Sequence, residues 1–297
     1  MPRRAAGGSG TVVRAVESHS SGVVKVAEPF FRTLEIIVPR LVRANGHRIT
    51  FDGLENIPER GGALVAVNHT GYVDWCPASI AALRRRRRLR FMIKTEMQDV
   101  APVKFVIKHT GLIPVDRSAG AGAYAVGVAR LKQGELVGIH PEATISRSFE
   151  LMEFKSGAAR LAHAADVPII PMIVWGTQRI WTKDRPKALW RSKIPVLVKI
   201  GAPMRPLPSV ERTSAELRRV MAALLEEAQR EYPHPPGAFW LPRRLGGSAP
   251  TPAEAQRLRE AELAERARKR EEQARKRARR TAGGARRRLL RAGDRRE

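Results

Sequence analysis

The fold is decided by a stretch near the start of the chain, residues 63–75, with the sequence ALVAVNHTGYVDW. Its first five residues, Ala63 to Val67, are all apolar and follow two glycines, as is typical of a buried strand that begins after a turn. Polar residues come next, with His69 on the loop and Asp74 five residues further on. If Asp74 lies in the first turns of a following helix, the two side chains can meet.

A contact between these side chains would have a chemical consequence. A carboxylate that accepts a hydrogen bond from one imidazole nitrogen fixes the tautomer and makes the other nitrogen a better base. His69 is therefore a candidate general base toward a hydroxyl group, and Asp74 is the candidate that orients it. Because a histidine and an aspartate at this spacing also occur by chance, other parts of the sequence have to support the assignment.

Outward from this stretch, short apolar runs alternate with helical patterns. Strands are predicted from residue 49 onward and at 63–67, 91–93, 112–115, 136–139, 169–174 and 196–200. Helices are predicted at 122–132, 156–165 and 214–231, the last with Thr213 or Ser214 as its N-terminal cap. This alternation predicts an α/β fold, with a mixed, largely parallel sheet flanked by helices, at residues 49–232.

The N-terminal part differs from this domain. Residues 1–21 are rich in Gly, Ser and Arg and predict a flexible start. In residues 22–48, apolar side chains recur at spacings of three and four, as in an amphipathic helix, and Pro29 allows either one helix or two. Charges interrupt this segment, so it falls short of the ~20 apolar residues that span a bilayer. We expect it to lie on a membrane surface or to pack on the core.

The charge predicts an anionic partner. Lys and Arg number 55 against 29 acidic residues, a formal net charge of +26, which suits nucleic acid, an anionic membrane or phosphorylated substrates. A Pro- and Gly-rich linker is predicted at 233–252, followed by an Arg-rich tail at 253–297 that is helical or disordered. The five arginines at 84–88 form either a solvated face or a contact for anionic lipid or coenzyme A phosphates.

The only cysteine, Cys76, excludes an intrachain disulfide and fits a reducing cytosol. It lies close to Asp74, but we expect a small buried side chain rather than a nucleophile. No secretory signal is visible in the first ten residues. Together with the amphipathic segment, these features predict a peripheral protein on the cytoplasmic face of a membrane.

Three further blocks follow the His69 segment. Residues 111–117, GLIPVDR, form a strand that ends in Arg117, whose planar fork can bind a phosphate. Residues 138–144, GIHPEAT, form a strand that runs into Glu142 and a turn. Residues 167–172, VPIIPM, form an apolar strand bracketed by prolines.

In this order and spacing, the four blocks resemble those of the lysophosphatidate acyltransferases, the 1-acylglycerol-3-phosphate O-acyltransferase family, over residues 50–205. The resemblance implies that His69 deprotonates the acceptor hydroxyl and that Asp74 orients it. The hydroxyl then attacks the thioester of acyl-CoA or acyl carrier protein without a covalent acyl-enzyme. The acceptor is a lysophospholipid or another lipid, and no metal or organic cofactor is implied.

The resemblance also implies substrate-binding residues. Arg117 matches a phosphate-contacting arginine, Glu142 the glutamate of the third block, and Lys155 a lysine before a helix start where an anion can bind. Thr144 and Arg147 belong to the third block as well. Here the sequence departs from the family pattern Pro-Glu-Gly-Thr-Arg-Ser, since Ala143 replaces the glycine and the arginine lies five residues after Glu142 instead of three.

This departure leaves the acceptor open. A glycolipid or diacylglycerol is the alternative to a lysophospholipid. A basic nucleic-acid-binding protein is a more remote alternative, because no recognition motif for nucleic acid accompanies the charge and the four blocks would have no explanation. His109 and His140 are expected to be structural.

Overall fold

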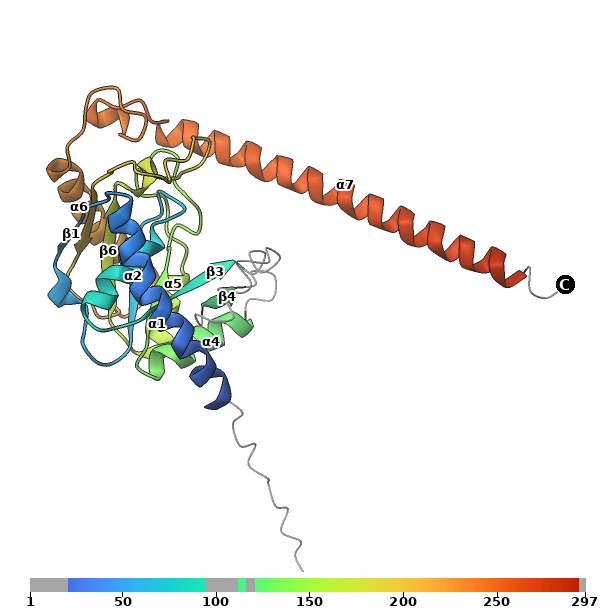
Figure 1. Ribbon diagram of the computed structural model, residues 1–297, viewed down its shortest axis with the longest axis horizontal. Coiled ribbons are helices and arrows are strands. Elements are labelled where there is room, and N and C mark those ends of the chain that lie inside the picture. The colour runs from blue at the N-terminus through green and yellow to red at the C-terminus, as the bar shows by residue number, and fades with distance from the viewer. Residues whose placement is uncertain (1–20, 95–111, 116–120, 294–297) are drawn as a thin grey trace, which may run out of the picture.

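The computed structural model describes residues 21–94, 112–115 and 121–293 of the chain. Residues 1–20, predicted to be flexible, lie outside the described residues, as does His109. Figure 1 shows an α/β body from which one long C-terminal helix projects.

The body is built on a seven-stranded sheet in the order β1-β7-β6-β2-β5-β3-β4. All neighbouring strands are parallel except β6 and β7, which are antiparallel. The prediction of a mixed, largely parallel sheet is therefore confirmed. The strands are β1 (Ile49–Asp52), β2 (Ala63–Val67), β3 (Leu89–Lys94), β4 (Ile113–Val115), β5 (Leu136–Ile139), β6 (Ile169–Trp175) and β7 (Val196–Ile200).

Strand β2 is central and completely buried, because both faces of the sheet are covered. Leu64 and Ala66 point into one apolar cluster, whereas Ala63, Val65 and Val67 point into the other. The two-residue period of a strand thus explains why the run is apolar at every position.

Helices cover the two faces. Helix α2 (Trp75–Arg84) packs on one face, and α4 (Ala121–Lys132), α5 (Gly157–Ala165) and α6 (Val210–Glu231) pack on the other. Short 3₁₀ turns η1 (Leu54–Asn56), η3 (Thr177–Arg179) and η4 (Arg243–Leu245) connect the larger elements.

The predicted start of α6 is wrong by one turn. Its N-cap is Ser209, whose hydroxyl accepts a hydrogen bond from the Arg212 amide at 3.2 Å. Thr213, one of the two residues that we expected to cap the helix, is buried and points inward, where its hydroxyl lies 2.9 Å from His163 Nε2. A hydroxyl inside the first turn can satisfy partners in the core, so the residue type alone did not identify the cap.

The N-terminal segment forms one helix, α1 (Ser21–Ala44), which contacts α2. Pro29 lies inside this helix and does not divide it in two. Ile36, Ile37 and Leu41 are each about half exposed, at 54%, 44% and 54%. Within the described residues, no helix is both long enough and apolar enough to cross a membrane.

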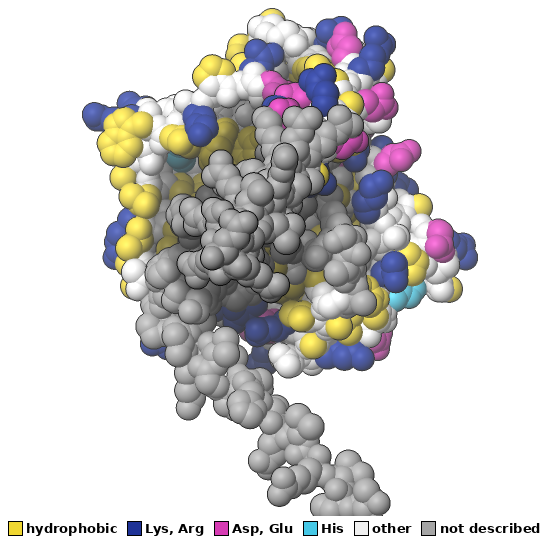
Figure 2. All heavy atoms as spheres, turned by 90° about the vertical axis from the view of Figure 1, so that its right-hand side faces the viewer, with side chains coloured by type: hydrophobic (Ala, Val, Ile, Leu, Met, Phe, Trp, Pro, Cys, Tyr) yellow, Lys and Arg dark blue, Asp and Glu magenta, His cyan; other side chains and the backbone are white. Residues whose placement is uncertain are grey.

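The segment at 233–252 is fixed to the core. Leu241 and Ala249 are fully buried and Trp240 is nearly so, and all three belong to the apolar cluster under α6. Helix α7 (Pro252–Gly293) then leaves the body (Figure 1). On the face drawn in Figure 2, Lys and Arg side chains lie around the visible edge, interspersed with Asp and Glu. The visible basic charge is thus spread out rather than gathered into one stripe.

Candidate active site

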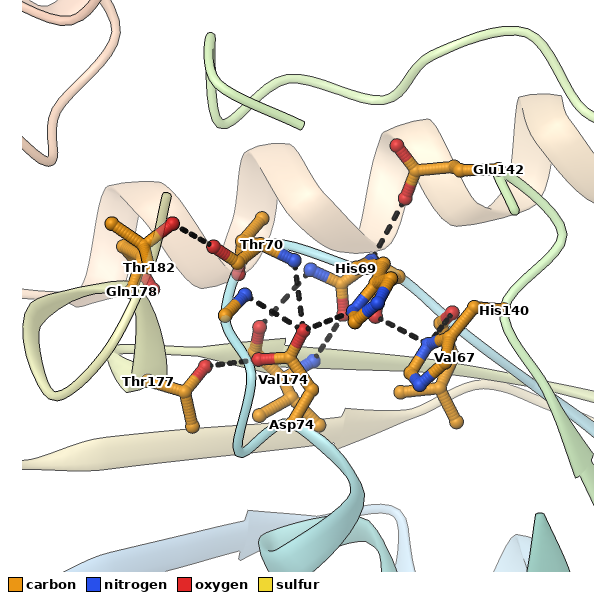
Figure 3. Close-up of polar contacts among 12 residues, drawn as sticks. Val67, His69, Thr70, Asp74, His140, Glu142, Val174, Thr177, Gln178 and Thr182 are labelled. Carbon is orange, nitrogen blue, oxygen red and sulfur yellow. Dashed lines mark hydrogen bonds and ion pairs between the residues drawn. The ribbon is translucent and has the colours of Figure 1, made fainter. Parts of the chain in front are cut away.

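His69 and Asp74 are in contact, as the sequence predicted. His69 follows the carboxyl end of β2, and Asp74 is the residue before α2. The imidazole Nδ1 lies 3.0 Å from Asp74 Oδ2 (Figure 3). If Nδ1 carries the proton, it donates to the carboxylate and leaves Nε2 with its lone pair free to accept a proton. The imidazole is 21% exposed, whereas the carboxylate is fully buried.

Three more donors hold the Asp74 carboxylate. Oδ2 accepts hydrogen bonds from the backbone amides of Thr70 at 2.8 Å and Gly71 at 2.9 Å. Oδ1 accepts a short hydrogen bond from the Thr177 hydroxyl. Because the carboxylate is fixed from both sides of the loop, the imidazole that it contacts has one orientation (Figure 3).

The backbone of His69 is fixed as well. Its amide donates to Glu142 Oε1 at 2.8 Å, and its carbonyl accepts from the Ser146 amide at 2.8 Å. The other carboxyl oxygen of Glu142 accepts from the Met152 amide at 3.0 Å. Burial raises the pKa of Glu142 to about 8, against the opposing effect of the two amides. From a fully buried position, Glu142 therefore connects the loop that carries His69 to the backbone at Met152.

His140 stacks on the imidazole of His69, with 4.0 Å between ring centroids and 11° between planes. Its Nδ1 lies 3.0 Å from the Val67 carbonyl and 3.1 Å from the Asn68 carbonyl, so this nitrogen carries the proton and donates. Burial, and secondarily the charge of His69, lower the pKa of His140 to about 3. His140 is thus a neutral ring that supports the partly exposed imidazole of His69. The expected structural role fits this position, but the stacking on His69 was not foreseen.

Comparison with known proteins indicates a family for part of the chain. Residues 48–175 match the model of the Acyltransferase family. This segment is an acyltransferase domain. It contains the His69–Asp74 pair and strands β2, β5 and β6, and it confirms the resemblance drawn from the four blocks.

The relatives of this acyltransferase domain include two bacterial enzymes. The 1-acyl-sn-glycerol-3-phosphate acyltransferase of Bacillus subtilis is 28% identical over 170 residues, which is 54% of this chain and 78% of that protein. A protein of the same name from Borreliella burgdorferi is 27% identical over 150 residues, 47% of this chain and 56% of that protein. These names confirm the prediction of an O-acyltransferase.

The crystal structure of the 1-acyl-sn-glycerophosphate acyltransferase PlsC from Thermotoga maritima has the same fold. It superposes with a TM-score of 0.58 at 21% identity, over 71% of this chain and 84% of that one. At this identity, the likeness supports the α/β fold of the acyltransferase.

The predicted substrate-binding residues lie in different surroundings. Arg117 lies outside the described residues. Lys155 is exposed beside the start of α5, and its amide donates to the Pro141 carbonyl at 2.9 Å. The Thr144 hydroxyl accepts from Lys183 Nζ at 3.3 Å. Arg147 is largely buried and ion-paired with Asp184 and with Glu262 of α7.

The arginine run at 84–88 lies at the other end of the sheet from His69. Arg87 donates to the Gly61 and Gly134 carbonyls, each at 2.8 Å, and these residues precede β2 and β5. The five residues of β2, about 16 Å at 3.3 Å per residue, separate this site from the carboxyl end that carries His69. The run therefore does not contact substrate groups beside His69.

Cys76 lies near Asp74 in sequence, but burial raises the pKa of its thiol to about 12. A thiol with such a pKa has almost no thiolate at neutral pH, so the expected non-nucleophilic role fits the structure.

Sequence reasoning missed two residues near the site, Thr177, which contacts Asp74, and Lys183, which contacts Thr144. Both follow β6, which pairs with β2 in parallel. The carboxyl ends of adjacent parallel strands meet at one edge of the sheet. Only knowledge that β6 is the neighbour of β2 could have brought the 176–184 segment beside His69.

Proposed function

We propose that this acyltransferase moves a fatty acyl group from a thioester, acyl-CoA or acyl carrier protein, to a hydroxyl of a lysophospholipid such as lysophosphatidate. The observation that carries the proposal is the contact of His69 Nδ1 with the buried carboxylate of Asp74. The relatives' names supply the acceptor class.

The proposed reaction has one proton carrier. His69 Nε2 takes the proton of the acceptor hydroxyl as its oxygen attacks the thioester carbonyl carbon. The carbon–sulfur bond then breaks, and the departing thiolate receives that proton from His69. Asp74 stabilises the imidazolium that forms in between. These steps use only protein side chains and the two substrates, so we expect no metal or organic cofactor.

We also propose that the enzyme works at an anionic membrane surface, on its cytoplasmic face. Helix α1 exposes Ile36, Ile37 and Leu41 while Arg32, Arg40 and Arg43 are exposed on the same helix. Apolar side chains that enter the lipid boundary, flanked by arginines that pair with anionic headgroups, are the features of an interfacial helix. No specific nucleic-acid target is needed to explain this charge.

The test is thiol release from acyl-CoA in the presence of lysophosphatidate, a glycolipid or diacylglycerol, by wild type and His69→Ala. We expect release that depends on lysophosphatidate and falls by about 10²-fold or more in the variant, as loss of a general base does. Release that needs a different acceptor would change the substrate, and release that the variant retains would remove His69 from the mechanism.

A further inference from the structure

A cluster of charged side chains beside the catalytic loop joins distant parts of the chain. Glu262 of α7 accepts hydrogen bonds at Oε2 from Arg147 Nη1 at 2.9 Å and from Lys183 Nζ at 2.8 Å. Its other oxygen, Oε1, accepts from Arg266, one turn further along α7. Arg147 Nε also donates to Asp184 Oδ2 at 2.5 Å. We call Arg147 and Lys183 the cation pair.

The cation pair is fixed to the loop that carries His69. Arg147 follows Ser146, whose amide donates to the His69 carbonyl at 2.8 Å. Lys183 follows Thr182, whose hydroxyl donates to the Thr70 carbonyl at 2.7 Å. Each cation is therefore one residue from a direct hydrogen bond to the loop, and an anion held by both would lie near the loop that carries His69.

The cation pair needs an anion because it is mostly buried. The side chains of Arg147 and Lys183 are 11% and 10% exposed, and Glu262 is 20% exposed. Removing a cation from water costs free energy unless a counter-charge replaces the solvent. Burial alone would raise the pKa of Glu262, but the hydrogen bonds from Lys183 and Arg147 hold it at about 2.

The donors of the cation pair also suit a phosphate ester. A guanidinium offers a planar fork, a lysine offers a point charge, and Thr144 adds a hydroxyl 3.3 Å from Lys183 Nζ. Once Glu262 leaves with α7, the two cations Arg147 and Lys183 face the single carboxylate of Asp184. A phosphate monoester, which is an anion at neutral pH, would replace the negative charge of Glu262.

Helix α7 is attached to the body near its start. Most of its length projects away from the domain (Figure 1). Near the start of α7, the Arg243–Glu254 ion pair is 3.0 Å long, and both side chains are about half exposed. Leu258 and Leu263, at 45% and 53% exposure, bury little apolar area. An exposed ion pair and half-buried leucines stabilise docking weakly, so an incoming anion could displace Glu262.

We propose that Arg147 and Lys183 bind a phosphate ester of a substrate, and that Glu262 occupies this site in the free protein as an autoinhibitory contact of α7. The inference rests on the proposed function for the identity of the substrate. Two substrates carry such a phosphate, the lysophosphatidate acceptor and the coenzyme A donor. Sequence reasoning expected Arg147 to contact phosphate, but it did not foresee Lys183 or the competing carboxylate.

The first test measures binding of inorganic phosphate to the full-length chain by calorimetry, without catalysis. We expect Glu262→Gln to bind phosphate about tenfold more tightly than wild type, within the usual range of coupling between sites. Glu265→Gln is the matched control, since Glu265 lies on the same helix and pairs with Lys269 outside the cluster. Adding Lys183→Met to Glu262→Gln should abolish the gain. Equal or weaker binding by Glu262→Gln would overturn the proposal.

Glutamine has nearly the helix propensity of glutamate, so the variant should keep α7, and Glu262→Ala repeats the test with a different side chain. Circular dichroism checks that each variant is folded.

The second test identifies the source of the phosphate by steady-state kinetics. A lower KM of Glu262→Gln for lysophosphatidate, with an unchanged KM for acyl-CoA, assigns the site to the acceptor, and the reverse assigns it to the donor. If neither KM falls, the site does not serve a substrate and the proposal fails.

The two proposals can fail separately. If the chain acylates no lysophospholipid but Glu262→Gln still binds phosphate more tightly, the anion site stands and the proposed function fails. If the chain acylates lysophosphatidate but Glu262→Gln binds phosphate no more tightly than wild type, the proposed function stands and the anion site fails.

Discussion

The hydroxyl of Thr177, on the 3₁₀ turn after β6, donates a hydrogen bond to the carboxylate of Asp74. Asp74 lies more than a hundred residues earlier in the chain. Both side chains are fully buried. This bond attaches the orienting carboxylate to the sheet edge rather than only to its own loop. The position of His69 therefore depends on two adjacent strands, β2 and β6.

We predict that Thr177→Val lowers kcat by about tenfold or more, because a hydrogen bond to a charged group contributes about 1.5–3 kcal/mol. The valine matches the shape of threonine but cannot donate to Asp74. Thr177→Ser keeps the hydroxyl and is the control, for which we expect near wild-type kcat. Steady-state thiol release measures both. Equal activity of Val and Ser variants would show that this bond does not matter for catalysis.

Asp74→Asn should remove the charge but keep the geometry. The amide oxygen of asparagine can accept from His69, Thr70 and Gly71 as Oδ2 does now, and the Thr177 hydroxyl can rotate to accept from the amide nitrogen. The imidazolium formed during the reaction loses its counter-charge. We therefore expect kcat to fall by about 10²–10⁴-fold. A melting temperature within a few degrees of wild type should accompany the loss, and a large drop in melting temperature would show that the carboxylate mainly supports the fold.

Ala143→Gly should stabilise the protein. Ala143 replaces the family glycine and has φ +58°, in the left-handed region that costs an L residue about 1–2 kcal/mol. Glycine adopts this region freely but loses more entropy on folding, about 0.5–1 kcal/mol. We expect a net gain of up to about 1 kcal/mol in the free energy of unfolding, by urea titration. A loss of stability would show that the backbone conformation of Ala143 does not destabilise the folded protein.

Glu142→Gln should change how stability depends on pH. The pKa of Glu142 is raised from 4.5 to about 8 in the folded protein, mainly by burial. Between these values the folded state holds more protons than the unfolded state, so this group makes stability fall as pH rises. The free energy of unfolding should fall by on the order of 1 kcal/mol per pH unit in this range because of this group.

Glutamine does not titrate, so the difference in unfolding free energy between Glu142→Gln and wild type should shift in favour of the variant from pH 5 to pH 8. Urea titrations at several pH values measure it. The partly exposed, ion-paired Glu216 offers a control, since Glu216→Gln should leave this slope nearly unchanged. A pH-independent difference for Glu142→Gln would show that the carboxyl is ionised throughout the range.

Local patterns in the sequence predicted most of the fold. Apolar runs flanked by turns gave the strands, because a strand buried on both faces has to be apolar at every position, as β2 is. The contact of His69 with Asp74 was also predictable, since a five-residue separation across a strand–loop–helix junction is itself local. The prediction of the N-cap of α6 was wrong, because Ser209 and Thr213 are both good cap residues and only packing distinguishes them.

The sequence by itself thus determined the α/β class and the contact of His69 with Asp74, which depend on residues near one another in the chain. The order of four short blocks along the chain indicated the family. Only the tertiary structure decided the order of the strands. With that order came the hydrogen bond from Thr177 to Asp74 and the stacking of His140 on His69. The pairing of Glu262 with Arg147 and Lys183 also depends on the tertiary structure. The physical reason is that these contacts join segments tens to more than a hundred residues apart. No periodicity or spacing encodes them, and they form only when packing of both faces of the sheet places β6, β5 and α7 around the carboxyl end of β2.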